Sequence, residues 1–201
     1  MPKVSQAHLD SRRDQILSAA RSCFNEKGFH RTTMKDIMAA SQLSAGAVYN
    51  YFNSKEDIIV AMAEKIVGGD AEFSDPPQVE LADNSLAGIF TTLFVPVLED
   101  PGQVHAACLN FDLVSEASRN ERIAACGPGL MQTSIEPLAA LIAQGQEAGA
   151  IDKNLNRPLL ARILVALYFG LVMQKVIEPD LDIKDLVEIL AALDKPGEEP
   201  L

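Results

Sequence analysis

Three hydroxyl residues mark the starts of three short helices in the most informative stretch of the chain. Thr33 precedes MKDIMAAS, with Asp36 at the third helical position. Ser54 precedes KEDIIV in the same way, with Asp57 at the matching position, and Ser44 begins the segment between them. Such a hydroxyl accepts a hydrogen bond from the helix N-terminus, and an acidic residue three positions later can return one. This spacing predicts two short helices joined by a tight turn and followed at once by a third.

The second helix, predicted over residues 45–52, has a composition that suits DNA reading. Two short helices three or four residues apart form a helix-turn-helix, whose second helix lies in the major groove. The first residues of this helix are small, and its unpaired N–H groups carry partial positive charge that suits a phosphate. The predicted DNA-binding residues are Thr33, Ser44, Ala45, Gly46, Tyr49, Asn50, Tyr51 and Lys55. Phe52 is expected in the core, and a core role stays open for Tyr49 and Tyr51.

Several spaced motifs extend this pattern in both directions. A Phe-x-x-x-Gly-Phe helix end begins at Phe24, and a helix led by Thr33 follows it. The pattern Ser-x-Gly-Ala-x-Tyr-x-Tyr-Phe and a Lys a few residues later complete the set. This segment, about the first third of the chain, resembles the N-terminal domain of the TetR family of transcriptional regulators. Gln42 departs from the pattern, because the family usually has Gly in the turn and a non-Gly residue at positive φ carries a cost.

The resemblance implies an all-α chain with two functional parts. Residues 1–54 would form a three-helix, helix-turn-helix DNA-binding domain. Residues 55–201 would form a helical effector-binding and dimerisation domain that begins with a linking helix over residues 55–67. The resemblance further implies a homodimer whose last two long helices pair in a four-helix bundle. The first hypothesis is a ligand-responsive regulator, most simply a repressor that a small hydrophobic effector releases from a palindromic operator.

Prolines and glycines divide the remainder of the chain into further predicted helices. Residues 70–84 are expected to form a loop. Pro96 is expected to bend or end the helix that contains it, and residues 103–120 are expected to form one helix. The sequence Gly-Pro-Gly at residues 127–129 predicts a kink or two helices within residues 121–149.

The helix that begins near Pro158 is strongly apolar. Its fifteen residues from Leu159 to Met173 fall short of the ~20 that cross a bilayer and include Arg162, so a buried helix is predicted. Apolar residues on this helix and the last one exceed what one subunit of this size should bury. The predicted dimer interface consists of Leu160, Ile163, Leu164, Leu167, Leu171, Ile183, Val187 and Leu190.

Two helices in the middle of the chain combine bulky apolar residues with few polar groups. The predicted effector pocket consists of Phe90, Leu93, Phe94, Cys108, Phe111 and Asp112. Such a lining suits a largely hydrophobic ligand with a cationic or hydroxyl group for Asp112. The alternative left open is that these residues fill the core. A DNA-binding architectural or partner-recruiting module without an effector is the second hypothesis, and a sealed core would favour it.

Charge and the spacing of reactive residues limit the other functions. Residues 1–67 hold nine of the 17 Lys and Arg but only seven of the 28 Asp and Glu, so the DNA-binding motif lies in the basic part of an acidic protein. The three histidines have no metal-ligand spacing, and no Gly-rich phosphate loop follows a strand. We therefore expect no enzyme, metal or cofactor. Three scattered cysteines and the absence of a signal-like segment after Met1 predict a cytoplasmic protein.

Overall fold

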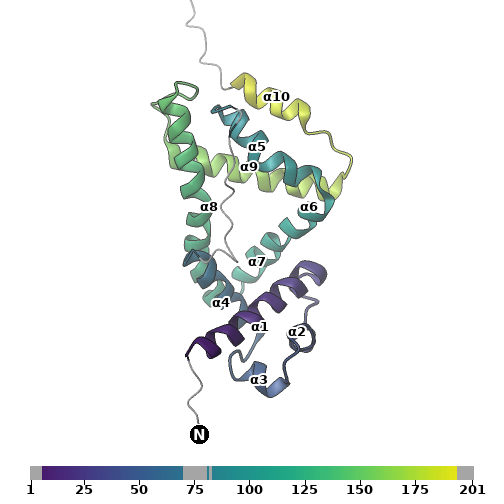
Figure 1. Ribbon diagram of the computed structural model, residues 1–201. Helices are drawn as coiled ribbons and strands as arrows, with labels where there is room; N and C mark the ends of the chain where they lie inside the picture. The colour runs from purple at the N-terminus through teal and green to yellow at the C-terminus, as the bar shows by residue number, and fades with distance from the viewer. Residues whose placement is uncertain (1–5, 70–80, 82, 194–201) are drawn as a thin grey trace, which may run out of the picture. The chain divides into compact units, whose positions relative to one another are not determined.

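Every regular element of the described residues is an α-helix (Figure 1). The computed structural model describes residues 6–69, 81 and 83–193. The chain divides into two compact units: Met1–Ser74 with Cys108–Leu130, and Asp75–Ala107 with Met131–Leu201. The predicted all-α class is confirmed, whereas the predicted functional boundary between residues 54 and 55 stays a prediction.

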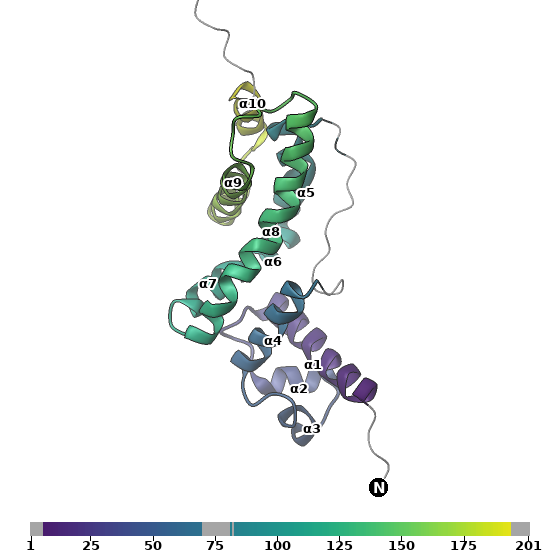
Figure 2. The same cartoon turned by 90° about the vertical axis from the view of Figure 1, so that its left-hand side faces the viewer.

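The first unit contains the helix-turn-helix and the elements that pack on it. Its helices are α1 Gln6–Lys27, α2 Met34–Ser41, α3 Ala45–Tyr49, α4 Lys55–Val67, α7 Leu109–Ala117 and the first ten residues of α8, which spans Glu121–Glu147. α1 packs against α2 and α4, and α2 contacts α3 (Figure 2). Gly28 follows α1 with φ 76°, which confirms the predicted left-handed helix end.

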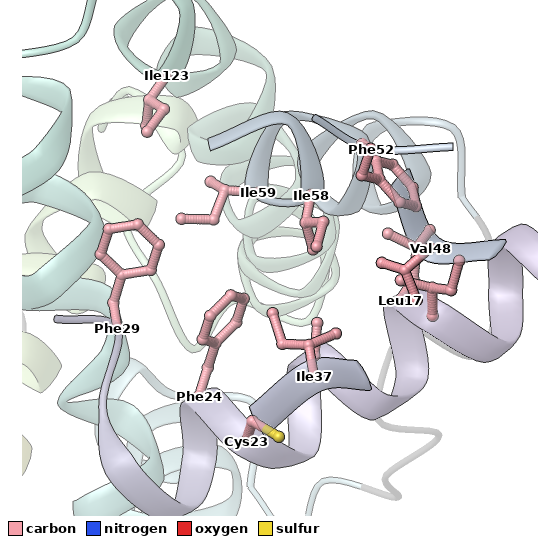
Figure 3. Close-up of a cluster of buried hydrophobic side chains, with 13 residues drawn as sticks. Leu17, Cys23, Phe24, Phe29, Ile37, Val48, Phe52, Ile58, Ile59 and Ile123 are labelled. Atoms are coloured by element: carbon pink, nitrogen blue, oxygen red, sulfur yellow. The ribbon is translucent and has the colours of Figure 1, made fainter. Parts of the chain in front are cut away.

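A single apolar cluster draws the helices of the first unit together (Figure 3). Ile16 of α1, Ile37 of α2, Val48 of α3 and Ile58 of α4 are all fully buried in it. Ile123 adds a side chain from α8. Each fully buried side chain of this kind contributes about 1.5–3 kcal/mol relative to an exposed one. The short α3 is therefore held in place by its contact with the cluster rather than by its own length.

In the second unit the helices pack around α5. Its helices are α5 Leu86–Glu99, α6 Pro101–Ala107, the remainder of α8, α9 Arg157–Ile177 and α10 Lys184–Leu193. α5 contacts α6, α9 and α10, and α6 also contacts α9. The buried Gln146 fixes the turn between α8 and α9, because its amide donates to Asp152 O at 2.7 Å and accepts from Arg157 Nε at 2.6 Å.

Three expectations about helix breaks need correction, although a bend at Pro96 and a kink within residues 121–149 stay predictions. α5 does not end at Pro96 but continues to Glu99, and α8 runs unbroken through Pro128, which excludes two helices there. A proline removes one backbone N–H, and packing along the rest of the helix can offset that loss. Residues 103–120 form the end of α6 and all of α7, with Cys108 between them, instead of one helix. Most of the predicted loop at residues 70–84 lies outside the described residues.

α9 is longer than the predicted apolar run. It has 21 residues and is apolar over most of its length, so by length and composition it could cross a membrane. The argument that the segment is too short is therefore wrong. Core helices of soluble proteins pass the same test, and α9 packs against α5 and α6. Only 28% of an apolar 18-residue stretch of α9 is buried within the chain, so much of its apolar surface is uncovered.

Candidate nucleic-acid interface

Thr33 and Asp36 bind each other at the start of α2. Asp36 N donates to Thr33 Oγ1 at 3.2 Å and Thr33 N donates to Asp36 Oδ2 at 2.8 Å, which confirms the predicted capping box. Thr33 Oγ1 also donates to Asp36 Oδ2 at 2.6 Å. Both donors of Thr33 are thus occupied within the protein. A phosphate oxygen only accepts hydrogen bonds. For Thr33 to donate to DNA as predicted, at least one of its bonds to Asp36 would have to break.

Lys27 pairs with the Asp36 carboxylate at the start of α2 and favours its ionised form. Its Nζ lies 2.7 Å from Asp36 Oδ1. This hydrogen bond, followed by those from Thr33, holds the pKa of Asp36 well below its usual range. The carboxylate therefore remains charged near neutral pH, where it complements the positive end of α2.

The turn between α2 and α3 passes through Gln42, which has φ 57° and ψ 27°. Among the described residues it is the single non-Gly residue with positive φ. Its N–H donates to Ala39 O at 3.3 Å, and the side chain of Gln15 on α1 donates to Ser41 O at 2.7 Å. The turn therefore keeps the backbone geometry that glycine adopts most readily, and α1 holds it from outside.

α3 is shorter than predicted, because it ends at Tyr49 rather than at Phe52. Ser44 Oγ accepts from Ala47 N at 3.2 Å, which confirms the predicted N-cap. Beyond the helix, Tyr51 N donates to Val48 O at 3.0 Å, a step of three residues that tightens the last turn. This tightening brings the chain directly to the cap of α4.

The two faces of α3 and its end differ sharply in burial. Val48 is fully buried and Phe52 is 3% exposed, which confirms the predicted core position of Phe52. Tyr49 is 49% exposed. The other exposed candidates are Ser44, Ala45, Gly46 and Asn50, while Tyr51 is partly buried. A Cβ added at Gly46 would meet nothing within 4 Å, so another molecule can approach this end closely.

Lys55, the first residue of α4, is partly buried and already has partners. Its Nζ donates to Phe29 O at 2.8 Å and lies 4.2 Å from the centroid of the Phe29 ring. An ammonium group has three donors. Donors therefore remain for a phosphate, and the predicted contact of Lys55 with DNA stays a prediction.

Asp57 completes the cap of α4 and also binds an arginine from α8. Its Oδ2 accepts from Asn53 N at 3.1 Å, and its N–H donates to Ser54 Oγ at 3.1 Å, as the sequence predicts. Arg122 Nη1 lies 2.7 Å from Asp57 Oδ1, and this hydrogen bond is the main reason that the pKa of Asp57 is lowered. No sequence spacing links Arg122 to this cap, so only the packing of α8 reveals the pair.

A groove of about 280 Å³ lies beside the residues that follow α3. Its lining includes Tyr51 and Phe52. Arg13 lies over the Phe52 ring at 5.5 Å, and its Nη2 lies 3.6 Å from a carboxylate oxygen of Glu64. The other arginine of the lining, Arg122, is paired with Asp57. The two arginines are thus balanced by two carboxylates, and the groove has no net positive charge with which to hold an anion.

The predicted effector residues fall in both units. Phe90, Leu93 and Phe94 lie on α5 in the second unit, and Cys108, Phe111 and Asp112 lie in the first. Phe94 contacts Phe90 at a centroid distance of 5.1 Å and stacks on Tyr168 of α9 at 4.8 Å. Sequence reasoning missed Tyr168, because only the packing of α9 against α5 brings it to Phe94. The effector pocket as a whole stays a prediction.

The predicted dimer residues differ in their exposure. Leu164, Leu171 and Ile183 are at most 2% exposed within the chain itself, whereas Ile163 is 60% exposed. Leu160, Leu167, Val187 and Leu190 are partly buried. The exposed large apolar residues of α9 are Leu159, Ile163, Met173, Val176 and Ile177. The interface stays a prediction, and of the predicted residues on α9 only Ile163 belongs to this exposed set.

The three thiols favour their protonated form. Burial is the largest cause that raises the pKa of Cys23, Cys108 and Cys126, and a protonated thiol is a poor nucleophile. Within residues 6–69, 81 and 83–193, no three His, Cys, Asp or Glu side chains gather in a way that could hold a metal ion.

Known proteins share both the N-terminal sequence and the fold. The family described as "Bacterial regulatory proteins, tetR family" matches residues 16–62. The HTH-type transcriptional regulator UidR of Escherichia coli K12 is 29% identical over 172 residues, which cover 83% of each chain. The solved structure of Salmonella enterica GusR has a TM-score of 0.65 and 26% identity, and the match covers 96% of this chain and 97% of that one.

A third relative shares the fold at lower identity. The structure of the transcriptional regulator FadR from Bacillus subtilis, in complex with stearoyl-CoA, has a TM-score of 0.55. The match has 20% identity and covers 92% of this chain and 99% of that one.

Proposed function

The chain belongs to the TetR family of transcriptional regulators, and from this premise we propose that it binds an operator as a homodimer and is released by a small molecule. Its relatives are named as regulators of transcription and not as enzymes. The observation that carries the proposal is the division of α3 into a buried face, with Val48, and an exposed face, with Tyr49. A helix anchored on one side and open on the other is suited to reading a major groove.

The exposed residues of α3 have the chemistry for two kinds of contact. Ala45 and Gly46 let the backbone approach DNA closely, whereas Tyr49 and Asn50 carry groups that can bind base edges. Lys55, with donors left after its bond to Phe29, would bind a phosphate. In this proposal α3 reads the sequence, and the start of α4 fixes the position of the head on the backbone.

The apolar stripe on α9 supports the dimer. Leu159, Ile163, Met173 and Ile177 are each more than half exposed, and Ala166 and Gly170 fall between them. The steps along this series are four and three residues in alternation, which is the spacing of a helix–helix seam. A Cβ added at Gly170 would meet nothing within 4 Å, so a partner helix can come close there. A second copy of α9 would cover the stripe.

Two observations support the binding of an effector: a ligand in a protein of the same fold, and the aromatic residues on α5 and α9. FadR, which shares the fold, is seen with stearoyl-CoA. In this chain the rings of Phe90, Phe94 and Tyr168 form a continuous aromatic series in the second unit. Such a series suits a hydrophobic ligand. We infer a repressor, because repression is the usual outcome in this family, and a cytoplasmic protein, because its partner is DNA.

Selection of bound sequences from a random duplex library tests the proposal. The expected product is a near-palindromic site whose half-sites lie about one helical turn apart, ~34–36 Å, as a two-fold dimer requires. Asn50→Ala should change the preferred half-site, whereas Lys55→Ala should weaken binding to all sequences. Recovery of no preferred duplex would contradict the proposal.

Release from the selected duplex tests the effector separately. A panel of hydrophobic small molecules should contain at least one that lowers operator affinity. If none does, and the protein still binds its operator, the effector-free architectural or partner-recruiting module replaces the sensor.

A further inference from the structure

The peptide groups on the two sides of Phe29 are held by charged side chains of two different helices. The N–H of Phe29 donates to Asp112 Oδ2 at 3.0 Å, and its carbonyl accepts from Lys55 Nζ at 2.8 Å. Asp112 lies on α7, and Lys55 is the first residue of α4. One residue in the loop after α1 therefore joins α7 to the start of α4 through two charge-assisted hydrogen bonds.

The surroundings of Phe29 leave it little freedom to absorb a movement. Its side chain is 2% exposed, and its ring packs against Phe24 at 5.4 Å and beneath the Lys55 ammonium at 4.2 Å. Gly28, just before it, has φ 76°, and a Cβ added there would come within 3.3 Å of Asp112 Oδ2. A shift of the Asp112 carboxylate would thus be passed on to Phe29 and the groups bound to it.

We propose that Asp112 is a positioning residue for DNA binding, which acts through the backbone of Phe29 to orient the Lys55 ammonium for its phosphate contact. The inference rests on the proposed function, because it requires that Lys55 contact DNA. The bond to the carboxylate holds the backbone of Phe29 in place and so fixes the position of its carbonyl, to which Lys55 donates. Asp112 therefore supports the acceptor that holds Lys55, although it touches no DNA itself.

Four single variants and one double variant separate positioning from general stability. Asp112→Ala removes the acceptor, and Asp112→Asn keeps an acceptor oxygen of the same reach. Glu116→Ala is the matched control on α7, because Glu116 Oε1 lies 3.4 Å from His30 Nδ1 and so contacts the same loop without touching the Phe29 peptides. Lys55→Ala and Lys55→Ala with Asp112→Ala complete a double-mutant cycle.

The first readout is affinity for the selected duplex over a series of salt concentrations. Asp112→Ala should weaken binding by about tenfold, the order of effect of one charge-assisted hydrogen bond. It should also reduce the slope of log K against log salt toward that of Lys55→Ala, by up to about 0.9 per subunit. The double variant should bind no more weakly than Lys55→Ala alone, Asp112→Asn should stay within about threefold of wild type, and Glu116→Ala should keep the wild-type slope.

The second readout needs no DNA. Amide hydrogen exchange at Phe29, normalised to the core amide of Ile37, should be at least about tenfold faster in Asp112→Ala and near wild type in Asp112→Asn. Unchanged exchange, an unchanged salt slope, or additive losses in the double variant would each overturn the positioning role. A wild-type protein that binds no duplex would overturn the proposed function itself and the positioning role with it, so the two failures are distinct.

Discussion

The helix-turn-helix segment and α9 are stabilised in opposite ways. At the starts of α2 and α4, side chains three residues apart bind each other and the backbone, as Thr33 does with Asp36 and Ser54 with Asp57. α9 instead leaves Ile163 and Ile177 60% and 72% exposed on its uncovered side. The helix-turn-helix segment is thus held by bonds within one chain, whereas α9 leaves apolar surface that a second copy would cover in the proposed dimer.

The largest expected effect concerns the exposed apolar face of α9. Ile163→Asp would place a charge in the apolar seam of both subunits, where an unpaired buried charge costs about 3–5 kcal/mol. The dimer should dissociate to monomer in sedimentation, and operator affinity should fall by a hundredfold or more. Ile163→Val keeps an apolar surface and should remain dimeric. An Ile163→Asp protein that stays a tight dimer would place the interface elsewhere.

A second prediction contrasts Tyr49, the last residue of α3, with Phe52, which follows the helix. Phe52→Ala would empty a buried site and should cost about 3–5 kcal/mol of unfolding free energy. Tyr49→Ala alters an exposed position and should cost at most about 0.5 kcal/mol, yet should weaken operator binding. Urea unfolding and duplex binding of the two variants measure both effects. Equal losses of stability in the two variants would contradict the assignment of Phe52 to the core and of Tyr49 to the surface proposed to contact DNA.

A third prediction concerns the charge at the start of α2. The depressed pKa of Asp36 means that its ionised form stabilises the fold above the unfolded-state pKa of about 3.9. That stability is lost as the pH falls through the lower pKa of the folded state. Asp36→Asn should therefore be less stable than wild type at pH 7, and the difference should shrink below about pH 4. Urea midpoints at several pH values measure this, and a difference that persists at low pH would contradict it.

The smallest predicted effect concerns Gln42, in the turn between α2 and α3. Gln42→Gly should be more stable than Gln42→Ala by about 0.5–1 kcal/mol, because the positive φ strains a residue with a Cβ but not glycine. Thermal unfolding of the two variants provides the measurement. Equal stability would show that the turn relaxes to another conformation when its side chain is removed.

Most of the local structure of the first unit could be predicted from the sequence. The N-caps at Thr33, Ser44 and Ser54, the core position of Phe52 and the left-handed end at Gly28 depend on residues within a few positions of one another. The helix ends expected from prolines were wrong, because α5 and α8 continue through them, whereas a bend at these positions stays a prediction. Propensity describes an isolated segment, whereas tertiary packing decides whether a weakened helix persists.

The sequence by itself determined the all-α class, the helix-turn-helix and the caps of its helices, since these follow from periodicity and from contacts three or four residues apart. Only the tertiary structure decided that Asp112 and Lys55 meet at Phe29, that Arg122 binds Asp57, and which residues of α9 remain uncovered. These features join residues that are far apart along the chain. Their pairing depends on how helices pack in three dimensions, which the local pattern of residues does not specify.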